Sequence, residues 1–371
     1  MDQRNSIVVS RRKFLTGMSA ACMLSSRPLG AKESAPLKSF ATERGILYGC
    51  AIRSKNLSDV PFTDAVIRDA AIIVPESEMK WSTVQPEAGR FDFSFADQLA
   101  AFSAQNKMKM RGHTLVWHAA NPNWLLEALK NAPRERILTD HIEKLVGHYR
   151  GRIHSWDVVN EAIEPSDGRA DGLRVKSPWY QAFGTNYIDL AFHAARKADP
   201  DALLCYNDFG VEAAASWHAP RRKAVLQFCE KLLSKGVPLD VVGIQGHLKA
   251  YRETFDEDVF SRFLFDIRSL GLKIMVTEHD VADIGGPFNI FKRDADVARL
   301  TRRFLDVVLD CPATIGVLTW GLSDRYSWLS DPVWGKRYCW PDGQLSRGLP
   351  LDASLLRKPM WYAMADAFVS R

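Results

Sequence analysis

The chain alternates eight times between a short apolar run and a longer stretch, most of them amphipathic and of helical length. The apolar runs are Ile46–Ile52, Ala71–Pro75, Lys109–Trp117, His154–Asn160, Leu203–Asn207, Val241–Gln245, Lys273–Thr277 and Thr314–Trp320. Runs of this kind predict buried strands, and helices placed between strands predict parallel pairing. Eight such units are typical of a closed (β/α)8 barrel, the TIM-barrel type of α/β fold. The 371 residues have room for one barrel as a single domain.

The stretches between the predicted strands carry apolar residues at helical spacing. They are Phe95–Asn106, Arg134–Tyr149, Tyr180–Ala198, Arg221–Lys235, Asp258–Leu270 and Asp294–Leu309, with a closing helix near Pro359–Phe368. The composition, 46% hydrophobic and 25% charged, is that of an ordinary globular protein. We therefore expect a single domain over residues 40–371, with no separate module after it.

The N-terminal segment differs in kind from the rest. Ser10-Arg11-Arg12-Lys13-Phe14-Leu15 resembles the twin-arginine export signal, and the apolar run that follows, Leu15–Leu24, is too short to span a bilayer. We expect a signal peptide over residues 1–31, with an approximate cleavage site near Ala31; a disordered basic tail is the alternative. The signal predicts a bacterial protein that is exported folded and is periplasmic or secreted.

Charge and cysteine content narrow the list of partners. Five basic residues and one acidic residue in the segment 1–31 account for +4 of the net charge of +5. The rest of the chain is close to neutral, which argues against nucleic acid and against membrane contact after signal removal. The remaining cysteines are odd in number and lack CxxC spacing, so free buried thiols are expected, and no zinc or redox site. They are Cys50, Cys205, Cys229, Cys311 and Cys339.

Two of the predicted strands end at a glutamate. Trp156-Asp157-Val158-Val159 leads into Asn160-Glu161, and Ile274-Met275-Val276 leads into Thr277-Glu278. Packing gives no reason for a polar residue at these positions. Two carboxyl groups that face each other across a cleft can hydrolyse a glycosidic bond, one as a protonated acid and the other as an ionised carboxylate.

Most of the other strand ends also carry polar or indole side chains. They include Glu76 and Lys80, His113 and Trp117, Asn207 and Asp208, Gln245 and His247, Asp280, Trp320 and Trp328. The carboxyl ends of barrel strands share one rim, so these side chains are expected to meet there. Amides and acids bind sugar hydroxyls and indoles stack on sugar rings, which predicts a carbohydrate site.

The motifs at these strand ends resemble those of glycoside hydrolase family 10, the endo-1,4-β-xylanases, over nearly all of the chain after the signal. The matching motifs are Glu76-x-x-Met-Lys80-Trp81, Gly112-His113-Thr-Leu-Val-Trp117-His118, Trp156-Asp157-Val-Val-Asn160-Glu161, Asn207-Asp208, Gly243-Ile-Gln245-Gly-His247, Thr277-Glu278-x-Asp280 and Thr-Trp320-Gly-x-x-Asp-x-Tyr-Ser-Trp328. The resemblance implies hydrolysis of internal β-1,4-xylosidic bonds of xylan or xylo-oligosaccharides by a retaining double displacement, without a cofactor or metal. A monomer is expected.

The resemblance also implies a role for each residue of the site. Glu161 is the acid/base and Glu278 the nucleophile, while Asn160 binds the 2-hydroxyl of the reacting sugar. His247 would donate to Glu278 and be oriented by Asp280, and Asn207 and Gln245 would support the two carboxylates. The subsites on the non-reducing side would be lined by Glu76, Lys80, His113, Trp320 and Trp328, with Trp117 as a further substrate contact.

Several positions depart from the family pattern. Ser77 stands where Asn is usual, and Ala119-Ala120 where Ser-Gln is usual. When a buried sugar hydroxyl loses such a hydrogen-bond partner, the binding free energy weakens by about 1–3 kcal/mol. Phe209 stands where a hydroxylated aromatic is common, and His279 replaces an apolar residue. The loop Asp331–Arg347, with Trp334, Tyr338 and Trp340, is interpreted as a wall of the substrate site, or else as packing on the barrel.

Some alternatives remain open from the sequence alone. Trp117 is either a sugar platform or a core residue, Trp156 is a core residue, and Asp280 is either a positioning residue or an ordinary ion-pair partner. A zinc site at His113 and His118 lacks the other ligands. A related β-glycosidase or β-1,4-glucanase would use the same carboxylate pair, whereas a silent binding protein would have lost it.

Overall fold

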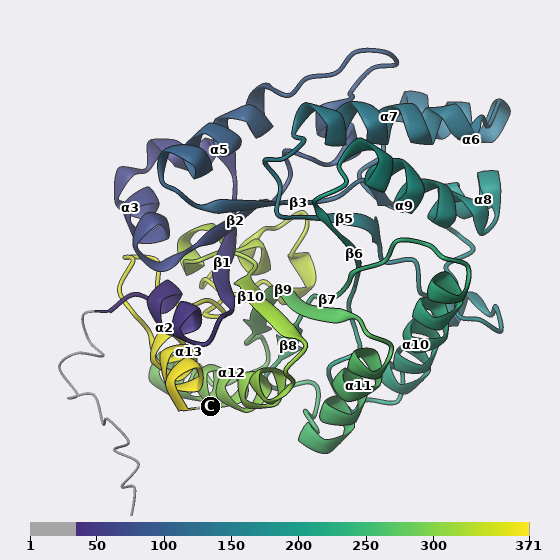
Figure 1. The fold of residues 1–371 in the computed structure, drawn as a ribbon. Coiled ribbons are helices and arrows are strands. Elements are labelled where there is room, and N and C mark those ends of the chain that lie inside the picture. Colours follow the sequence, from purple (N-terminus) through teal and green to yellow (C-terminus); the bar gives the residue numbers. More distant parts are fainter. Residues whose placement is uncertain (1–34, 371) are drawn as a thin grey trace, which may run out of the picture. The chain divides into compact units, whose positions relative to one another are not determined.

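In the computed structural model, which describes residues 35–370, eight parallel strands close into a barrel (Figure 1). The strands are β1 (Leu47–Ile52), β2 (Ile72–Pro75), β3 (Lys109–Gly112), β5 (Ser155–Asn160), β6 (Leu203–Asp208), β7 (Val241–Ile244), β9 (Lys273–Ala282) and β10 (Thr314–Thr319). The barrel is closed because β10 pairs with both β9 and β1. The predicted fold class is confirmed. The expected signal peptide, residues 1–31, lies outside the described residues.

Two short strands lengthen the rim of the barrel and correct the predicted strand limits. The third strand does not run unbroken from Lys109 to Trp117, because the chain leaves the sheet at His113 and returns as β4 (Val116–Trp117), which pairs with β5. The seventh strand does not stop at Thr277. It continues to Ala282 because β8 (His247–Lys249) pairs with its last residues.

Helices surround the barrel on its outside (Figure 1). They are α2 (Leu37–Glu43), α3 (Val60–Asp69), α4 (Trp81–Val84), α5 (Ser94–Gln105), α6 (Asn123–Asn131), α7 (Glu135–His148), α8 (Pro178–Phe183), α9 (Asn186–Ala198), α10 (His218–Ser234), α11 (Glu257–Ser269), α12 (Ile290–Asp310) and α13 (Pro359–Ser370). The predicted helix Tyr180–Ala198 is two helices, because Gly184 adopts a φ of 60° between them. Among residues 35–370, none of the helices combines the length and apolar composition needed to cross a bilayer.

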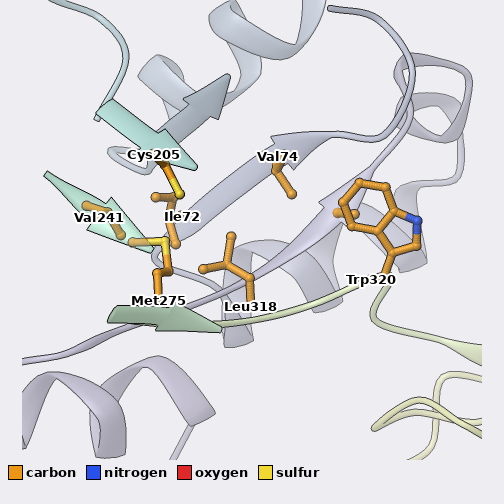
Figure 2. Close-up of a cluster of buried hydrophobic side chains, with 8 residues drawn as sticks. Ile72, Val74, Cys205, Val241, Met275, Leu318 and Trp320 are labelled. Atoms are coloured by element: carbon orange, nitrogen blue, oxygen red, sulfur yellow. The ribbon is translucent and has the colours of Figure 1, made fainter. Parts of the chain in front are cut away.

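The inside of the barrel is filled by apolar side chains from six strands and the residue that follows β10 (Figure 2). The cluster comprises Ala51, Ile72, Val74, Cys205, Val241, Met275, Leu318 and Trp320. Full burial of an aliphatic side chain stabilises a fold by about 1.5–3 kcal/mol. Trp320 lies at one end of this cluster and is 7% exposed, so it is both the top of the core and the floor of the site.

The five cysteines in the part of the chain that the structure describes, residues 35–370, are free thiols. Four of them are buried, as predicted, whereas Cys339 is half-buried and departs from the expectation.

The loop after β10 packs firmly against the barrel. Tyr338 and Trp340 are 4% and 6% exposed and cluster with Leu329 from the start of the loop. Beneath them, Asp283 and Arg293 form an ion pair at 2.9 Å in which both side chains are fully buried. The loop is therefore anchored by apolar contacts and by the hydrogen bonds that Trp340 Nε1 and Ser346 Oγ donate to Asp283 Oδ1, at 3.3 Å and 2.8 Å.

Candidate active site

A cleft with a volume of about 570 Å³ opens at the carboxyl ends of the strands. Eleven of the predicted site residues line it: Glu76, Lys80, His113, Trp117, Asn160, Glu161, Gln245, His247, Glu278, Trp320 and Trp328. The other two, Asn207 and Asp280, lie behind the cleft wall and are hydrogen-bonded to residues that line it. The motifs of seven strands thus converge on one site.

Glu161 is held by the turn that follows β5. Its φ of 57° is in the left-handed region, and its N–H donates to the carbonyl of Asn207 at 2.9 Å. The side-chain Oε1 accepts hydrogen bonds from Gln245 Nε2 at 3.0 Å and from Asn160 Nδ2 at 3.2 Å. His118 Nδ1 lies 3.6 Å from Oε2. The carboxyl group therefore faces the cleft with neutral amide donors as its nearest partners.

Glu278 has different surroundings. Its Oε1 accepts from Asn207 Nδ2 at 2.7 Å and its Oε2 lies 3.2 Å from His247 Nε2. Burial raises the pKa of Glu278, but the His247 hydrogen bond, the charges of His113 and His247 and the Asn207 hydrogen bond together lower it to about 2. Glu278 is therefore ionised at neutral pH, as a nucleophile must be.

His247 is oriented from its other ring nitrogen. Its Nδ1 lies 2.9 Å from Asp280 Oδ1. Burial lowers the pKa of His247, yet the charge of Asp280 and the contacts with Asp280 and Glu278 raise it to about 10. Asp280 also accepts a hydrogen bond from Trp328 Nε1 at 2.5 Å. Both partners of Asp280 are residues of the cleft wall, which favours a positioning role over that of an ordinary ion-pair partner.

A line of amide groups connects the two carboxylates. Asn207 Nδ2 donates to Asn160 Oδ1 at 2.9 Å as well as to Glu278, and Asn160 Nδ2 donates to Glu161. The side-chain oxygen of Asn207, Oδ1, accepts from Thr277 Oγ1 at 2.7 Å. Because each amide makes specific hydrogen bonds, the positions of Glu161 and Glu278 are fixed relative to each other.

The opposite half of the cleft is lined by residues that follow β2, β3 and β10. Glu76 forms an ion pair with Arg53, and burial raises its pKa although Arg53 acts to lower it. Lys80 Nζ lies over the ring of Trp117 at 4.9 Å from the centroid and over Trp320 at 6.0 Å. Burial lowers the pKa of Lys80, while Glu76 and the two catalytic-site carboxylates raise it. The Lys80 ammonium is thus surrounded by carboxylates and indole rings.

Of the histidine and tryptophan residues near β3, some line the cleft and others lie in the core. His113 Nδ1 lies 2.9 Å from Asp157, which is also paired with the buried Arg111. Trp117 lines the cleft, whereas Trp156 is fully buried and packs directly on Gly112. Trp156 is therefore the core residue that was predicted. Within residues 35–370, no three His, Cys, Asp or Glu side chains are grouped in the manner of metal ligands.

Comparison with known proteins identifies the family. The model of glycosyl hydrolase family 10 matches residues 36–367. The chain belongs to this family. It is 34% identical to endo-1,4-beta-xylanase B of Thermotoga neapolitana over 90% of this chain and 92% of that one. It is 36% identical to a beta-1,4-xylanase of Dictyoglomus thermophilum, over 72% and 73% of the two chains.

Solved structures of family 10 proteins have the same fold. Native xylanase 10B from Thermotoga maritima matches with a TM-score of 0.78 and 32% identity, over 91% of this chain and 98% of that one. Xylanase 10B from Thermotoga petrophila RKU-1, solved in complex with xylobiose, matches with the same four values. The protein is therefore a glycoside hydrolase of the retaining type that family 10 comprises.

The departures from the family 10 pattern lie in the cleft itself. Four of these positions line the cleft: Ser77, Ala119, Ala120 and Phe209. Because Ser77 and Ala120 lack the amide groups of the family pattern, the cleft offers fewer hydrogen-bonding groups to sugar hydroxyls at these two positions. His279 instead lies in the core, where Nδ1 bonds to the carbonyl of Gly246 at 2.9 Å. Its ring stacks on Phe304, so this histidine is a satisfied core residue.

Several residues of the cleft wall were not among the predicted site residues. They include Arg53, Trp217, His218, Lys249, Trp334 and Arg337. In the loop Asp331–Arg347, Trp334 and Tyr338 line the cleft, whereas Trp340 packs on the barrel. Each of the two interpretations of this loop is therefore partly correct. Trp217 follows the run Ala213-Ala214-Ala215-Ser216, where an isolated large aromatic in a loop was an available signal.

Proposed function

We propose that this protein is an endo-1,4-β-xylanase that cleaves internal bonds of xylan with retention of configuration. The observation that carries the proposal is the difference between two carboxyl groups in one cleft. Glu278 is bonded to a cationic histidine and an amide, whereas Glu161 has amide donors. Unlike surroundings of this kind separate a nucleophile from an acid/base.

In the first step, the Glu278 carboxylate attacks the anomeric carbon and Glu161 donates its proton to the departing glycosidic oxygen. The bond to the leaving sugar breaks and a covalent glycosyl ester of Glu278 forms. In the second step, Glu161 removes a proton from water, whose oxygen attacks the same carbon and releases Glu278. Two inversions at one carbon give overall retention, and both side chains return to their starting states.

Neighbouring residues bind the sugars on the non-reducing side. Asn160, between the two carboxylates, is placed to hydrogen-bond the 2-hydroxyl, a contact that tightens in the transition state. Trp320 and Trp328 provide flat apolar surfaces, and Glu76 and Lys80 provide polar partners. The cleft is built from groups that recognise neutral sugars.

Substitution of the carboxyl groups tests the proposal. Glu161→Ala and Glu278→Ala should each reduce xylan hydrolysis by at least about a hundredfold, the lower range for a lost catalytic group. Glu87→Ala, which removes an exposed carboxylate outside the cleft, is the matched control. Near-wild-type turnover in either catalytic variant would contradict the assignment, and inverted products detected by NMR would contradict the mechanism.

A β-1,4-glucanase would use the same pair of carboxylates on another sugar. The missing amides at Ser77 and Ala120 make this comparison worthwhile, because they change how one glycone sugar is held. Aryl β-xylobioside and aryl β-cellobioside distinguish the two activities, since only glucose carries the extra hydroxymethyl group. We expect faster cleavage of the xylobioside. Faster cleavage of the cellobioside would mean that the substrate is a β-1,4-glucan and not xylan.

We also propose that the protein is exported and acts outside the cytoplasm as a monomer. The support for export is the Ser10–Leu15 motif with the apolar run after it. Fractionation of cells that express the full chain should recover activity outside the cytoplasm. Arg11→Lys together with Arg12→Lys should retain it inside, and unchanged export of that variant would contradict the signal.

A further inference from the structure

A patch of exposed apolar side chains lies at the start of α12, outside the cleft. Phe288 is 74% exposed and Phe291 is 79% exposed, and Ile290 between them is exposed as well. Within residues 35–370 these are the two most exposed phenylalanines. Large apolar side chains that gather on the surface of a soluble protein mark a binding surface. We call these three residues the Phe288–Phe291 patch.

The patch lies at the same end of the barrel as the cleft. Strand β9 carries Glu278 and ends at Ala282, and α12 begins at Ile290. The residues between them, 283–289, therefore form the loop at the carboxyl end of β9. The carboxyl ends of all barrel strands share one rim, so this loop belongs to the rim that surrounds the cleft.

A series of aromatic contacts connects the patch to the wall of the cleft. The ring centroid of Phe288 lies 6.0 Å from that of Trp340. Trp340 belongs to the same buried cluster as Tyr338, which lines the cleft. Tyr338 in turn meets Trp328, another residue of the cleft wall, edge to face at 5.3 Å. The patch is therefore continuous with the substrate cleft.

The foundation of the patch is fixed by specific contacts. Trp340 Nε1 donates to Asp283 Oδ1 at 3.3 Å, and the guanidinium of Arg293 lies 4.2 Å from the centroid of the Trp340 ring. Asn289 caps α12, because its side-chain oxygen accepts from the N–H of Lys292 at 3.1 Å. Both ends of the segment that carries the patch are thus anchored, so its rings have little freedom to lose on binding.

Charged groups border the patch on the exposed side of α12. Lys292 directly follows Phe291, and its ammonium donates to Asp296 Oδ2 at 3.3 Å. Arg299 forms an ion pair with the same carboxylate, and the side chains of Lys292 and Arg299 are both largely exposed. Aromatic faces with polar groups beside them suit a sugar chain, which has apolar ring faces and a rim of hydroxyl groups.

The length of the substrate indicates what occupies this surface. The cleft has a volume of about 570 Å³, which is within the range that holds one small ligand. A xylan polymer is much longer, so most of its sugars lie outside the cleft when one of its bonds is cleaved. The rim beside the cleft is where these outer sugars, and neighbouring chains of insoluble xylan, meet the protein.

We propose that the Phe288–Phe291 patch is a second carbohydrate-binding surface, which holds xylan outside the catalytic cleft. The proposal rests on the proposed function and deepens it. The phenyl rings of Phe288 and Phe291 stack on the apolar faces of xylose units, and Lys292 and Arg299 donate to their hydroxyl groups. Attachment at two places raises the effective concentration of bonds at the cleft, whereas a short substrate reaches the cleft alone.

The test compares insoluble xylan with aryl β-xylobioside, which is too short to reach both places. Phe288→Ala together with Phe291→Ala should lower the ratio of the rate on dilute insoluble xylan to the rate on aryl xylobioside by roughly three- to tenfold, as expected for lost aromatic contacts. Phe288→Trp together with Phe291→Trp keeps the aromatic faces and should not lower this ratio.

A binding measurement separates attachment from turnover. In a Glu278→Ala background, which prevents digestion of the substrate, the alanine pair should weaken retention of the protein on insoluble xylan by a similar factor. Phe265→Ala is the matched control, because Phe265 is also exposed but lies in the second half of α11 and does not line the cleft. This control should leave the ratio and the retention unchanged.

Three results would contradict these assignments. An unchanged ratio together with unchanged retention in the alanine pair would overturn the inference. A dimer that the alanine pair converts to a monomer would assign the patch to a contact between two copies of the chain, and would also overturn it. Inactivity of the unsubstituted protein on both substrates would instead overturn the proposed function, so the failures are distinguishable.

Discussion

The contact between His247 and Glu278 determines how activity should depend on pH. His247→Ala removes a ring nitrogen 3.2 Å from Glu278 and, because the pKa of His247 is raised to about 10 despite burial, it also removes a cation. Burial, the largest influence on the pKa of Glu278, then acts against weaker opposition from Asn207 and His113. The pKa of Glu278 should rise from about 2 to its ordinary 4.5 or above.

The size of the effect follows from these values. A rise from about 2 to 4.5 is roughly a 300-fold increase in proton affinity, on the order of 3 kcal/mol. The acid limb of kcat/KM reports ionisation of the free enzyme. Its midpoint should therefore move upward by about two pH units in His247→Ala.

The assay is hydrolysis of aryl β-xylobioside across the acidic and neutral range. His247→Gln, which keeps a neutral donor, should give an intermediate limb. His154→Ala removes a half-buried histidine that does not line the cleft and should leave the limb in place. If the acid limb of His247→Ala coincided with that of the unsubstituted protein, the reasoning that Glu278 depends on His247 would be refuted.

The same pair has a signature in stability. The pKa of Glu278 is lower in the folded state, so its contribution is present above about 4.5 and is lost as the pH falls toward 2. The pKa of His247 is higher in the folded state, so its contribution is present below about 6.5 and is lost as the pH rises toward 10. The difference in Tm between the unsubstituted protein and His247→Ala should therefore be largest between about pH 4.5 and 6.5.

Three further predictions concern other parts of the chain. His279→Leu removes the ring bonds to Gly246 and Thr301 and should lower the free energy of unfolding by about 1–3 kcal/mol, measured in urea; no change would contradict the role given to the ring. Asp283→Ala leaves Arg293 buried without its ion-pair partner and should cost about 3–5 kcal/mol by the same measurement, and a stable variant would show that the pair is dispensable. Ser77→Asn adds an amide to the cleft and should lower KM for aryl xylobioside by about tenfold; an unchanged KM would place the missing amide outside the sugar path.

The sequence was sufficient for the barrel and for its rim because both depend on strands. Each apolar run has to be buried, and its end has to reach the shared rim, so Glu161 and Glu278 could be assigned to one cleft from their positions alone. The break of the third strand at His113 was not predictable from periodicity. Thr114 and Leu115 bond instead to the carbonyl of Asp157, a contact that depends on the neighbouring strand.

The helices and loops show where local signals end. The helix α3 begins after Asp59, whose carboxylate accepts from Phe62 N–H at 3.3 Å, and this cap was a readable signal that the strand–helix pattern did not include. Trp217 and Lys249 lie in segments without periodicity. The contact between them depends on Gly210, on which the indole packs, and on the position of Lys249 at the end of β8. Cleft walls built from loops follow from tertiary packing, which no sequence window contains.

A single residue, Gly246, separates Gln245 from His247, and these two side chains support different carboxylates. The N–H of Gly246 is bonded to Glu212 and its carbonyl to His279, so the peptide is fixed on both sides. A displacement of this peptide would disturb the proton donor and the nucleophile at the same moment. Formation and breakdown of the glycosyl ester would then slow together, because each step needs both carboxyl groups in place.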